Sequence, residues 1–281
     1  MYISDTTLEQ LIEEDIPYID FTSEILGINE QKGTIEYITR EDTCICGVEE
    51  VIRILKKFDI EVIDSKKSGI FLKKGSTILK AKGEASALHM CWKVCVNILE
   101  NSSGIATRTK KFVDIAKAQN PKIEIITTRK TFPGTKKLAM KAIIAGGAFP
   151  HRLGLSETVL VFEEHMRFIG GIDMFIKKIE LYKQKAGEKK IIAEAHNIEN
   201  AISLAKAGVD VIQLDKFSIA DIKESIKKIR QISTDIKVGA AGGVNLKNVE
   251  AIAKTGVDLI TTSALYFGKP SDIKADLQKI L

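Results

Sequence analysis

The sequence predicts an α/β fold in which a small N-terminal α+β sandwich precedes an incomplete parallel α/β barrel. In the last third of the chain, short β-branched runs alternate with segments that repeat apolar residues at helical spacing. The repeat length of about 21 to 27 residues fits successive βα units. About six strands fit after residue 104, fewer than the eight of a complete TIM barrel, and a doubly wound sheet is the alternative.

Residues 1–103 are predicted to form the sandwich and a linking helix. Polar starts, helical spacing and alternating runs between Gly-rich or polar turns predict helices at 6–15 and 47–58, and strands at 33–39, 60–64 and 76–82. A long helical stretch follows at 84–103. It resumes after Gly104, so we expect a hinge between two helices at this glycine.

Residues 104–268 are predicted to form the barrel, and residues 269–281 a short amphipathic helix that packs on the N-terminal domain. Barrel strands are expected within 122–130, 141–148, 159–165, 191–195, 209–215, 236–243 and 257–265. The helices between the last four strands begin with polar residues, and two of them end in Gly.

Composition narrows the class of protein. The chain has 281 residues and a net charge of only +5, with basic and acidic residues interspersed, so a nucleic-acid partner is not expected. No export signal and no apolar run of about 20 residues is present, which predicts a cytoplasmic protein without a membrane partner. The four cysteines are interpreted as ordinary half-buried thiols, and a four-thiolate zinc site is the alternative: Cys44, Cys46, Cys91 and Cys95.

Polar residues recur where the predicted barrel strands end, which is where parallel α/β folds place their functional groups. They are Arg129, Lys130, His151, Arg152, Glu163, Glu164, His165, Glu194, with His196 two residues on, Asp215 and Lys216. Arg and Lys bind anions, and carboxylates bind hydroxyls or a divalent cation, so the set suits a small anionic substrate. Gly242 and Gly243 before a helix, with Ser263 one strand later, suit a phosphate group and hence a phosphorylated sugar.

Some of these residues have a structural interpretation of equal or greater weight. His151 and His165 fit the holding of a strand end as well as they fit a site. His89, on a helix of the first domain, is interpreted as structural. Arginine is scarce in this lysine-rich chain, so Arg129 and Arg152 at strand ends favour function.

Three strings resemble nicotinate-nucleotide pyrophosphorylase, also called quinolinate phosphoribosyltransferase: SGIATRT at 103–109, TTRKTFPGTKKLAMKAIIAGGAFPHRLGLSETVLVFEEH at 127–165 and LDKF at 214–217. The resemblance is closest to the ModD-type pyrophosphorylases of molybdenum-transport operons. It implies transfer of phosphoribose from phosphoribosyl pyrophosphate to a pyridine nitrogen, with Mg²⁺ as cofactor and release of pyrophosphate. It also implies a homodimer in which the sandwich of one subunit caps the barrel mouth of the other.

The resemblance also assigns roles to individual residues. It places Arg129, Lys130, His151 and Arg152 on the carboxylates of the acceptor, together with Lys93 from the neighbouring subunit. Glu194 and Asp215 lie on the ribose and magnesium side, directly or indirectly bound to the ion, and act with Lys130 as catalytic groups. The resemblance places the phosphate loop on Gly242 and Gly243, and the strand-end pattern adds Ser263 as a phosphate-binding residue.

The chain departs from the family pattern mainly on the acceptor side. Phe162 stands where quinolinate enzymes carry a lysine, and Lys93 where they carry an arginine. Further departures are Thr127, Ala240, Ala241 and Ser263. Loss of one positive charge, and of one bidentate guanidinium, weakens recognition of a second carboxylate. We therefore expect the transferase chemistry to be kept and the acceptor to have changed.

Two other functions fit the same sequence. One is an anion-binding accessory protein in molybdenum transport, although anion binding gains nothing from the carboxylates Glu194 and Asp215. The other is a Schiff-base aldolase that uses Lys130 or Lys216.

Overall fold

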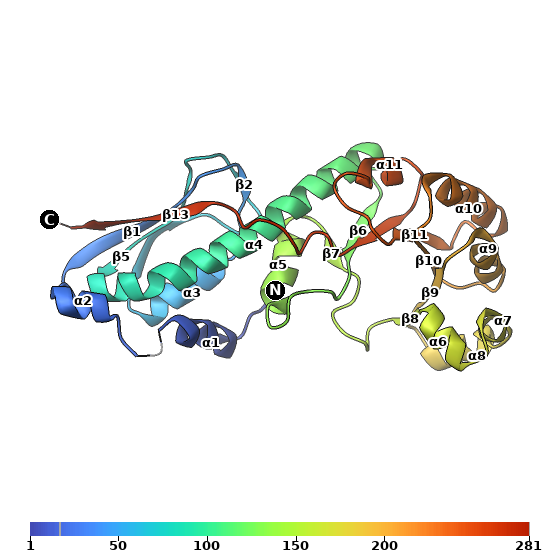
Figure 1. Ribbon diagram of the computed structural model, residues 1–281, viewed down its shortest axis with the longest axis horizontal. Helices are drawn as coiled ribbons and strands as arrows, with labels where there is room; N and C mark the ends of the chain where they lie inside the picture. The colour runs from blue at the N-terminus through green and yellow to red at the C-terminus, as the bar shows by residue number, and fades with distance from the viewer. Residues whose placement is uncertain (17, 281) are drawn as a thin grey trace. The chain divides into compact units, whose positions relative to one another are not determined.

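The computed structural model describes residues 1–16 and 18–280, and the chain forms two compact units (Figure 1). The first comprises Met1–Lys111, Phe132–Gly147 and Tyr266–Leu281, and the second comprises Phe112–Thr131 and Ala148–Leu265. Each unit is therefore assembled from segments that are distant in sequence. Among the described residues, no helix has both the length and the apolar character needed to cross a membrane.

The first unit contains a four-stranded antiparallel sheet in the order β13-β1-β5-β3. Its strands are β1 (Lys32–Thr39), β3 (Glu61–Ser65), β5 (Thr77–Glu84) and β13 (Ile273–Lys279), and β2 (Thr43–Cys44) pairs separately with β4 (Phe71–Leu72). Its helices are α1 (Asp5–Asp15), α2 (Phe21–Leu26), α3 (Val48–Lys57), most of α4 (Ala85–Gln119) and α5 (Lys136–Ala145). The predicted strands and the first two predicted helices of the sandwich are thus observed.

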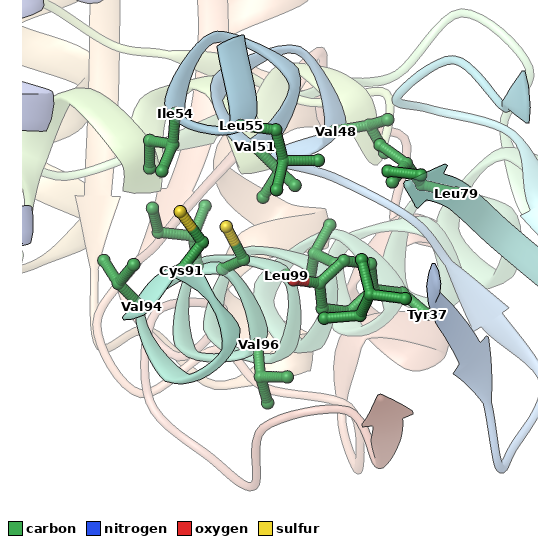
Figure 2. Packing of buried hydrophobic residues seen from close by; sticks show 14 of the residues in the cluster. Tyr37, Val48, Val51, Ile54, Leu55, Leu79, Cys91, Val94, Val96 and Leu99 are labelled. Carbon is green, nitrogen blue, oxygen red and sulfur yellow. The ribbon is translucent and has the colours of Figure 1, made fainter. Parts of the chain in front are cut away.

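The core of the first unit lies between this sheet and helices α3 and α4. In β1 every second residue is buried, as expected of a strand with one face on a core. Figure 2 shows Tyr37 and Leu79 from the sheet packed with apolar side chains of α3 and with Cys91, Val94, Val96 and Leu99 of α4.

The four cysteines divide between two apolar clusters. Cys91 and Cys95 belong to the main core, whereas Cys44 and Cys46 pack with Ala106 and Ala142. All four are thiols rather than disulfides and are fully buried, more deeply than the predicted half-buried state. Burial raises the pKa of Cys46 and of Cys95 to about 12, so these thiols are poor thiolate ligands at neutral pH. The alternative of a four-thiolate zinc site has no support in this arrangement.

Two predictions for the first unit are wrong. The segment after Pro270 is the strand β13 rather than a helix, and it pairs antiparallel with β1 along its whole length. Residue 281 of that predicted helix lies outside the described residues. Gly104 is not a hinge, because α4 runs through it without a break. A Cβ there would lie 2.9 Å from the carbonyl oxygen of Lys269 and from the Cα of Pro270, so the glycine permits close approach of the backbone.

The second unit is a curled, incomplete barrel of seven parallel strands, as predicted (Figure 1). The strand order is β7-β6-β12-β11-β10-β9-β8, and the strands are β6 (Glu124–Thr127), β7 (Phe149–Pro150), β8 (Val159–Val161), β9 (Ile191–Ala195), β10 (Val211–Asp215), β11 (Lys237–Ala241) and β12 (Leu259–Thr262). Its helices are α6 (Glu163–Phe168), α7 (Ile172–Lys177), α8 (Ile179–Ala186), α9 (Ile198–Lys206), α10 (Ile219–Ile232) and α11 (Val249–Ala253). The strand predicted within 141–148 is wrong, because residues 141–145 end helix α5 and the strand β7 begins at Phe149.

Candidate active site

A cleft of about 670 Å³ opens at the carboxyl ends of the barrel strands. It gathers every predicted site residue of the second unit: Arg129, Lys130, His151, Arg152, Glu194, Asp215, Gly242, Gly243 and Ser263. Parallel strands end at one edge of the sheet, which explains how residues 134 positions apart meet there, from Arg129 to Ser263. Lys93 belongs to the first unit, where its exposed Nζ lies 4.6 Å from the centre of the Trp92 ring.

Two arginines mark one part of the cleft. Arg129 follows β6 and is exposed, whereas Arg152 follows β7 and is only 7% exposed. Among the described residues, the one hydrogen bond of the Arg152 guanidinium goes to the carbonyl oxygen of Thr158, at 3.5 Å. Burial and the neighbouring charge of Arg129 lower the pKa of Arg152, and burial and Arg152 lower that of His151. The charge of Glu157 opposes the lowering of the Arg152 pKa, but no carboxylate of the described residues forms an ion pair with either arginine.

Carboxylates occupy the ends of the adjacent strands β9 and β10. Glu194 is half-buried, and its Oε1 accepts a hydrogen bond of 3.0 Å from Nε2 of Gln213. The Oε1 of Gln213 in turn accepts a bond of 3.2 Å from Thr261. Burial raises the pKa of Glu194; the bond from Gln213 opposes this shift, and the charge of Asp215 adds to it. The buried amide and hydroxyl therefore fix the orientation of this carboxylate.

Sequence reasoning missed three residues at this site: Gln213, Thr261 and His196. The first two lie on the interior of strands, and the register of the sheet places Gln213 directly opposite Glu194. One signal was available, since Gln213 stands two residues before Asp215 and alternation puts both on the same face. His196 stands two residues after Glu194 and was noticed, but was not assigned to the site.

The loop after β11 has the backbone that a phosphate site requires. Gly242 and Gly243 have φ of +81° and +73°, and a Cβ on Gly242 would lie 2.5 Å from Oδ1 of Asp215. Gly243 faces open space, and its carbonyl accepts bonds from the side chains of Asn245 and Asn248. Helix α11 begins only at Val249, so the loop itself, rather than the helix terminus that we expected, borders the cleft.

The end of β8 is partly apolar. Phe162 lines the cleft, and its ring stacks on that of His165 at 5.6 Å between centroids. The backbone N–H of Phe162 donates to Nδ1 of His165 at 3.0 Å, which gives this histidine the structural role of capping α6. Glu164 also lines the cleft, whereas Glu163 pairs with Arg167 on the same helix.

One group of side chains could hold a metal ion. Donor atoms of Glu194, His196 and Asp215 all lie within 4.8 Å of one another, and the three form the single such group in residues 1–16 and 18–280. Two carboxylates that converge in this way fit a divalent cation such as Mg²⁺.

Known proteins resemble the chain over its whole length. The models "Quinolinate phosphoribosyl transferase, N-terminal domain" and "Quinolinate phosphoribosyl transferase, C-terminal domain" match residues 20–103 and 105–276. A protein of Pasteurella multocida named "Putative pyrophosphorylase ModD" is 37% identical over 279 residues, which covers 99% of each chain. A "Probable nicotinate-nucleotide pyrophosphorylase" of Synechocystis is 32% identical and covers 93% of this chain and 88% of its own. The crystal structure of a nicotinate-nucleotide pyrophosphorylase from Ehrlichia chaffeensis superposes with a TM-score of 0.89 at 28% identity, covering 99% of this chain and 100% of that one.

Proposed function

Because the chain belongs to the quinolinate phosphoribosyl transferase family of pentosyltransferases, we propose that it transfers phosphoribose from phosphoribosyl pyrophosphate to a pyridine-carboxylate-like acceptor such as quinolinate. The observation that carries the proposal is Arg152, a buried guanidinium on the wall of the cleft that forms no ion pair with a carboxylate of the described residues. A buried charge without a partner is costly, and an anionic substrate would supply the missing partner.

The basic part of the cleft would hold the acceptor. Arg129 and Arg152 present planar guanidinium groups that match a carboxylate in two hydrogen bonds each, with Lys130 and His151 beside them. Lowering of the His151 pKa by burial and Arg152 keeps its imidazole neutral at pH 7, so it would donate or accept one hydrogen bond. These groups would hold the ring nitrogen ready to attack.

The carboxylate part of the cleft would hold the ribose. Positive charge develops at the C1 carbon as its bond to pyrophosphate breaks, and Glu194 and Asp215 stabilise that charge while the ring nitrogen attacks. A bound Mg²⁺, held by these two carboxylates directly or through water, would neutralise charge on the departing pyrophosphate, with Lys130 as a further cation. Gly242, Gly243 and Ser263 would bind the phosphate of the phosphoribose. Catalysis then comes from positioning and electrostatics, without a covalent enzyme intermediate.

The active form would be a cytoplasmic homodimer with shared sites. Lys93 is exposed on α4, and we assign it to the acceptor pocket of the partner subunit. Neither nucleic acid nor a membrane enters this reaction.

A second candidate keeps the fold and changes the ligand. Phe162 brings an aromatic ring to the cleft where the family resemblance predicts a cation, which favours an acceptor other than quinolinate or an anion-binding accessory role in molybdenum transport. The "Putative pyrophosphorylase ModD" relatives are consistent with this branch.

An aldolase is disfavoured, since Lys130 and Lys216 are exposed, whereas Schiff-base lysines are desolvated.

The test is release of pyrophosphate. The pure protein is incubated with phosphoribosyl pyrophosphate, Mg²⁺ and a panel of pyridine and related carboxylates, and CO₂ is measured in parallel. We expect release with at least one acceptor, and the Arg129→Lys variant should raise the KM for that acceptor while the KM for phosphoribosyl pyrophosphate stays unchanged. Tight molybdate binding by calorimetry, without pyrophosphate release from any acceptor, would instead establish the accessory role.

A further inference from the structure

The imidazole of His196 lies between the two carboxylates of the cleft and has no role in the proposed reaction. Its Nε2 is 3.6 Å from Oε2 of Glu194, and its Nδ1 is 3.8 Å from Oδ2 of Asp215. Its Nε2 also lies 3.7 Å from Oε2 of Glu163. The polar neighbours of this ring among the described residues are therefore carboxylate oxygens.

These separations are too long for hydrogen bonds, and a different ring nitrogen lies nearer each carboxylate. A protonated imidazole that merely balanced the carboxylates would approach them to about 2.7–2.9 Å. A cation takes only one of the two ring nitrogens, and one donor atom of each of the three side chains lies within 4.8 Å of the other two. A small side-chain rotation brings such donors to the roughly 3–4 Å that separates ligands bound to one cation at about 2.1 Å.

The Glu194 carboxylate is oriented before any ion arrives, and Asp215 lies against the loop at Gly242. Glu194 receives the bond from Gln213, and a Cβ is excluded at Gly242 because the backbone there lies against Asp215. Side-chain exposure is 11% for Glu194 and 17% for Asp215, against 37% for His196. The carboxylate oxygens are therefore the more buried donors, and the imidazole adds a nitrogen donor from the more exposed side of the group.

We propose that His196 is a direct ligand of the divalent cation at this site and that the site prefers a first-row transition ion to Mg²⁺. Mg²⁺ selects oxygen ligands and keeps much of its water, whereas imidazole nitrogen favours ions such as Fe²⁺, Co²⁺, Ni²⁺ or Zn²⁺. The inference rests on the proposed function only in placing a cation between Glu194 and Asp215. Binding without substrate tests it separately from phosphoribosyl transfer.

The experiment is calorimetric titration of the full, metal-free chain with NiCl₂ and with MgCl₂, in the absence of substrate. We expect Ni²⁺ to bind at least about tenfold more tightly than Mg²⁺. The His196→Ala variant should lose about tenfold or more in Ni²⁺ affinity and less than about threefold in Mg²⁺ affinity. The His196→Asp variant, whose three ligands are all carboxylates, should reduce the difference between the affinities for Ni²⁺ and Mg²⁺. His89→Ala, which removes an imidazole of the first unit that contacts the carbonyl of Ala85, should match the parent.

A spectroscopic readout makes the result independent of affinity. Mn²⁺ bound to the parent protein should show ¹⁴N modulation from the imidazole in electron spin echo spectra, and His196→Ala should abolish it while His89→Ala retains it. If His196→Ala does not fold, His196→Asn replaces it in both measurements. Equal affinity of the parent for Ni²⁺ and Mg²⁺, or ¹⁴N modulation that survives removal of His196, would overturn the inference. Failure to release pyrophosphate would count against the proposed function alone.

Discussion

The seven arginines of this lysine-rich chain differ in the groups to which they donate hydrogen bonds. Five of them donate to a carboxylate or a carbonyl of their own unit, and the partners explain why each is an arginine: Arg40, Arg53, Arg108, Arg167 and Arg230. Arg129 and Arg152 form no ion pair in the described part of the chain, although Arg152 keeps a 3.5 Å bond to the carbonyl of Thr158, and both line the cleft. The contacts thus single out the same two arginines that their scarcity and their place at strand ends favour as ligand-binding residues.

Replacement of Arg152 by Met should stabilise the free protein while it removes acceptor binding. The buried guanidinium has one long hydrogen bond, so its desolvation is poorly compensated, and an apolar side chain of similar length avoids that cost. We expect the free energy of unfolding to rise by about 1 kcal/mol, which differential scanning calorimetry would show as an increase of roughly 2–4 °C in Tm. Arg230→Met is the matched control, since it leaves Asp258 without its 2.5 Å partner and should lower Tm. A fall in Tm for both variants would show that the Arg152 charge is satisfied within the protein.

At the scale of elements, the sequence predicted which segments form strands and helices better than it predicted which strands pair with each other. The parallel strands were identifiable because burial on both faces leaves short, continuous apolar runs. The C-terminal segment was misassigned because its partner β1 lies more than 230 residues earlier, and pairing with that strand overrides the local pattern. The site followed the same rule. Strand ends carry their signal in the sequence, whereas Gln213 beside Glu194 depends on the register of neighbouring strands.

Gly104→Ala tests the close approach between α4 and the chain that leads into β13. Alanine favours a helix by about 1 kcal/mol over glycine, yet its Cβ would meet the backbone of residues 269–271 at 2.9–3.0 Å. Those atoms belong to the backbone, so they can move only if the whole segment shifts. We therefore expect the free energy of unfolding, measured by urea unfolding, to fall by about 1–2 kcal/mol. Asn101→Ala, an exposed change on the same helix, should be neutral or stabilising, and an equal effect of the two changes would refute the steric explanation.

The ion pair between Glu49 of α3 and Lys141 of α5 makes stability depend on pH. Burial would raise the pKa of Glu49, but hydrogen bonds from Lys141 of α5 and from Ser68 lower it from 4.5 to about 2. A carboxyl group with a lowered pKa in the folded state stabilises above its unfolded pKa, and this contribution disappears as the pH falls from about 4.5 to about 2. Glu49→Gln should thus destabilise the protein at pH 7 by about 1 kcal/mol, a value reduced for the partial exposure of this side chain.

The measurement for this pair is urea unfolding of parent and variant between about pH 7 and pH 3. The difference between them should shrink steadily below about pH 4.5. Glu9→Gln, which breaks the exposed pair with Lys57 at 2.8 Å, should have little effect at any pH. A Glu49→Gln difference that stayed constant down to pH 3 would exclude the ionised Glu49 as its source.

At the scale of the whole molecule, the homodimer proposal takes the groups of one site from two subunits. The cleft of the second unit contains the cations, the carboxylates and the glycine loop, while Lys93 lies in the first unit. A lysine held 4.6 Å over the Trp92 ring has its stem packed and its ammonium group exposed, which suits contact with an anion outside its own unit. In the proposed homodimer, that anion is the substrate bound to the partner subunit.

Subunit complementation tests the shared site directly. Lys93→Ala and Glu194→Gln are each expected to lower activity at least about tenfold as pure proteins, because each removes a group that the reaction uses. In a mixed dimer, one site combines both changes and the other combines neither, provided that Lys93 serves the partner's cleft. Random exchange makes half of the dimers mixed, so an equimolar mixture should recover about a quarter of the parent activity, measured as pyrophosphate release after co-refolding. A mixture no more active than the mean of the two pure variants would place each site within one chain, and full activity of Lys93→Ala alone would remove this residue from the site.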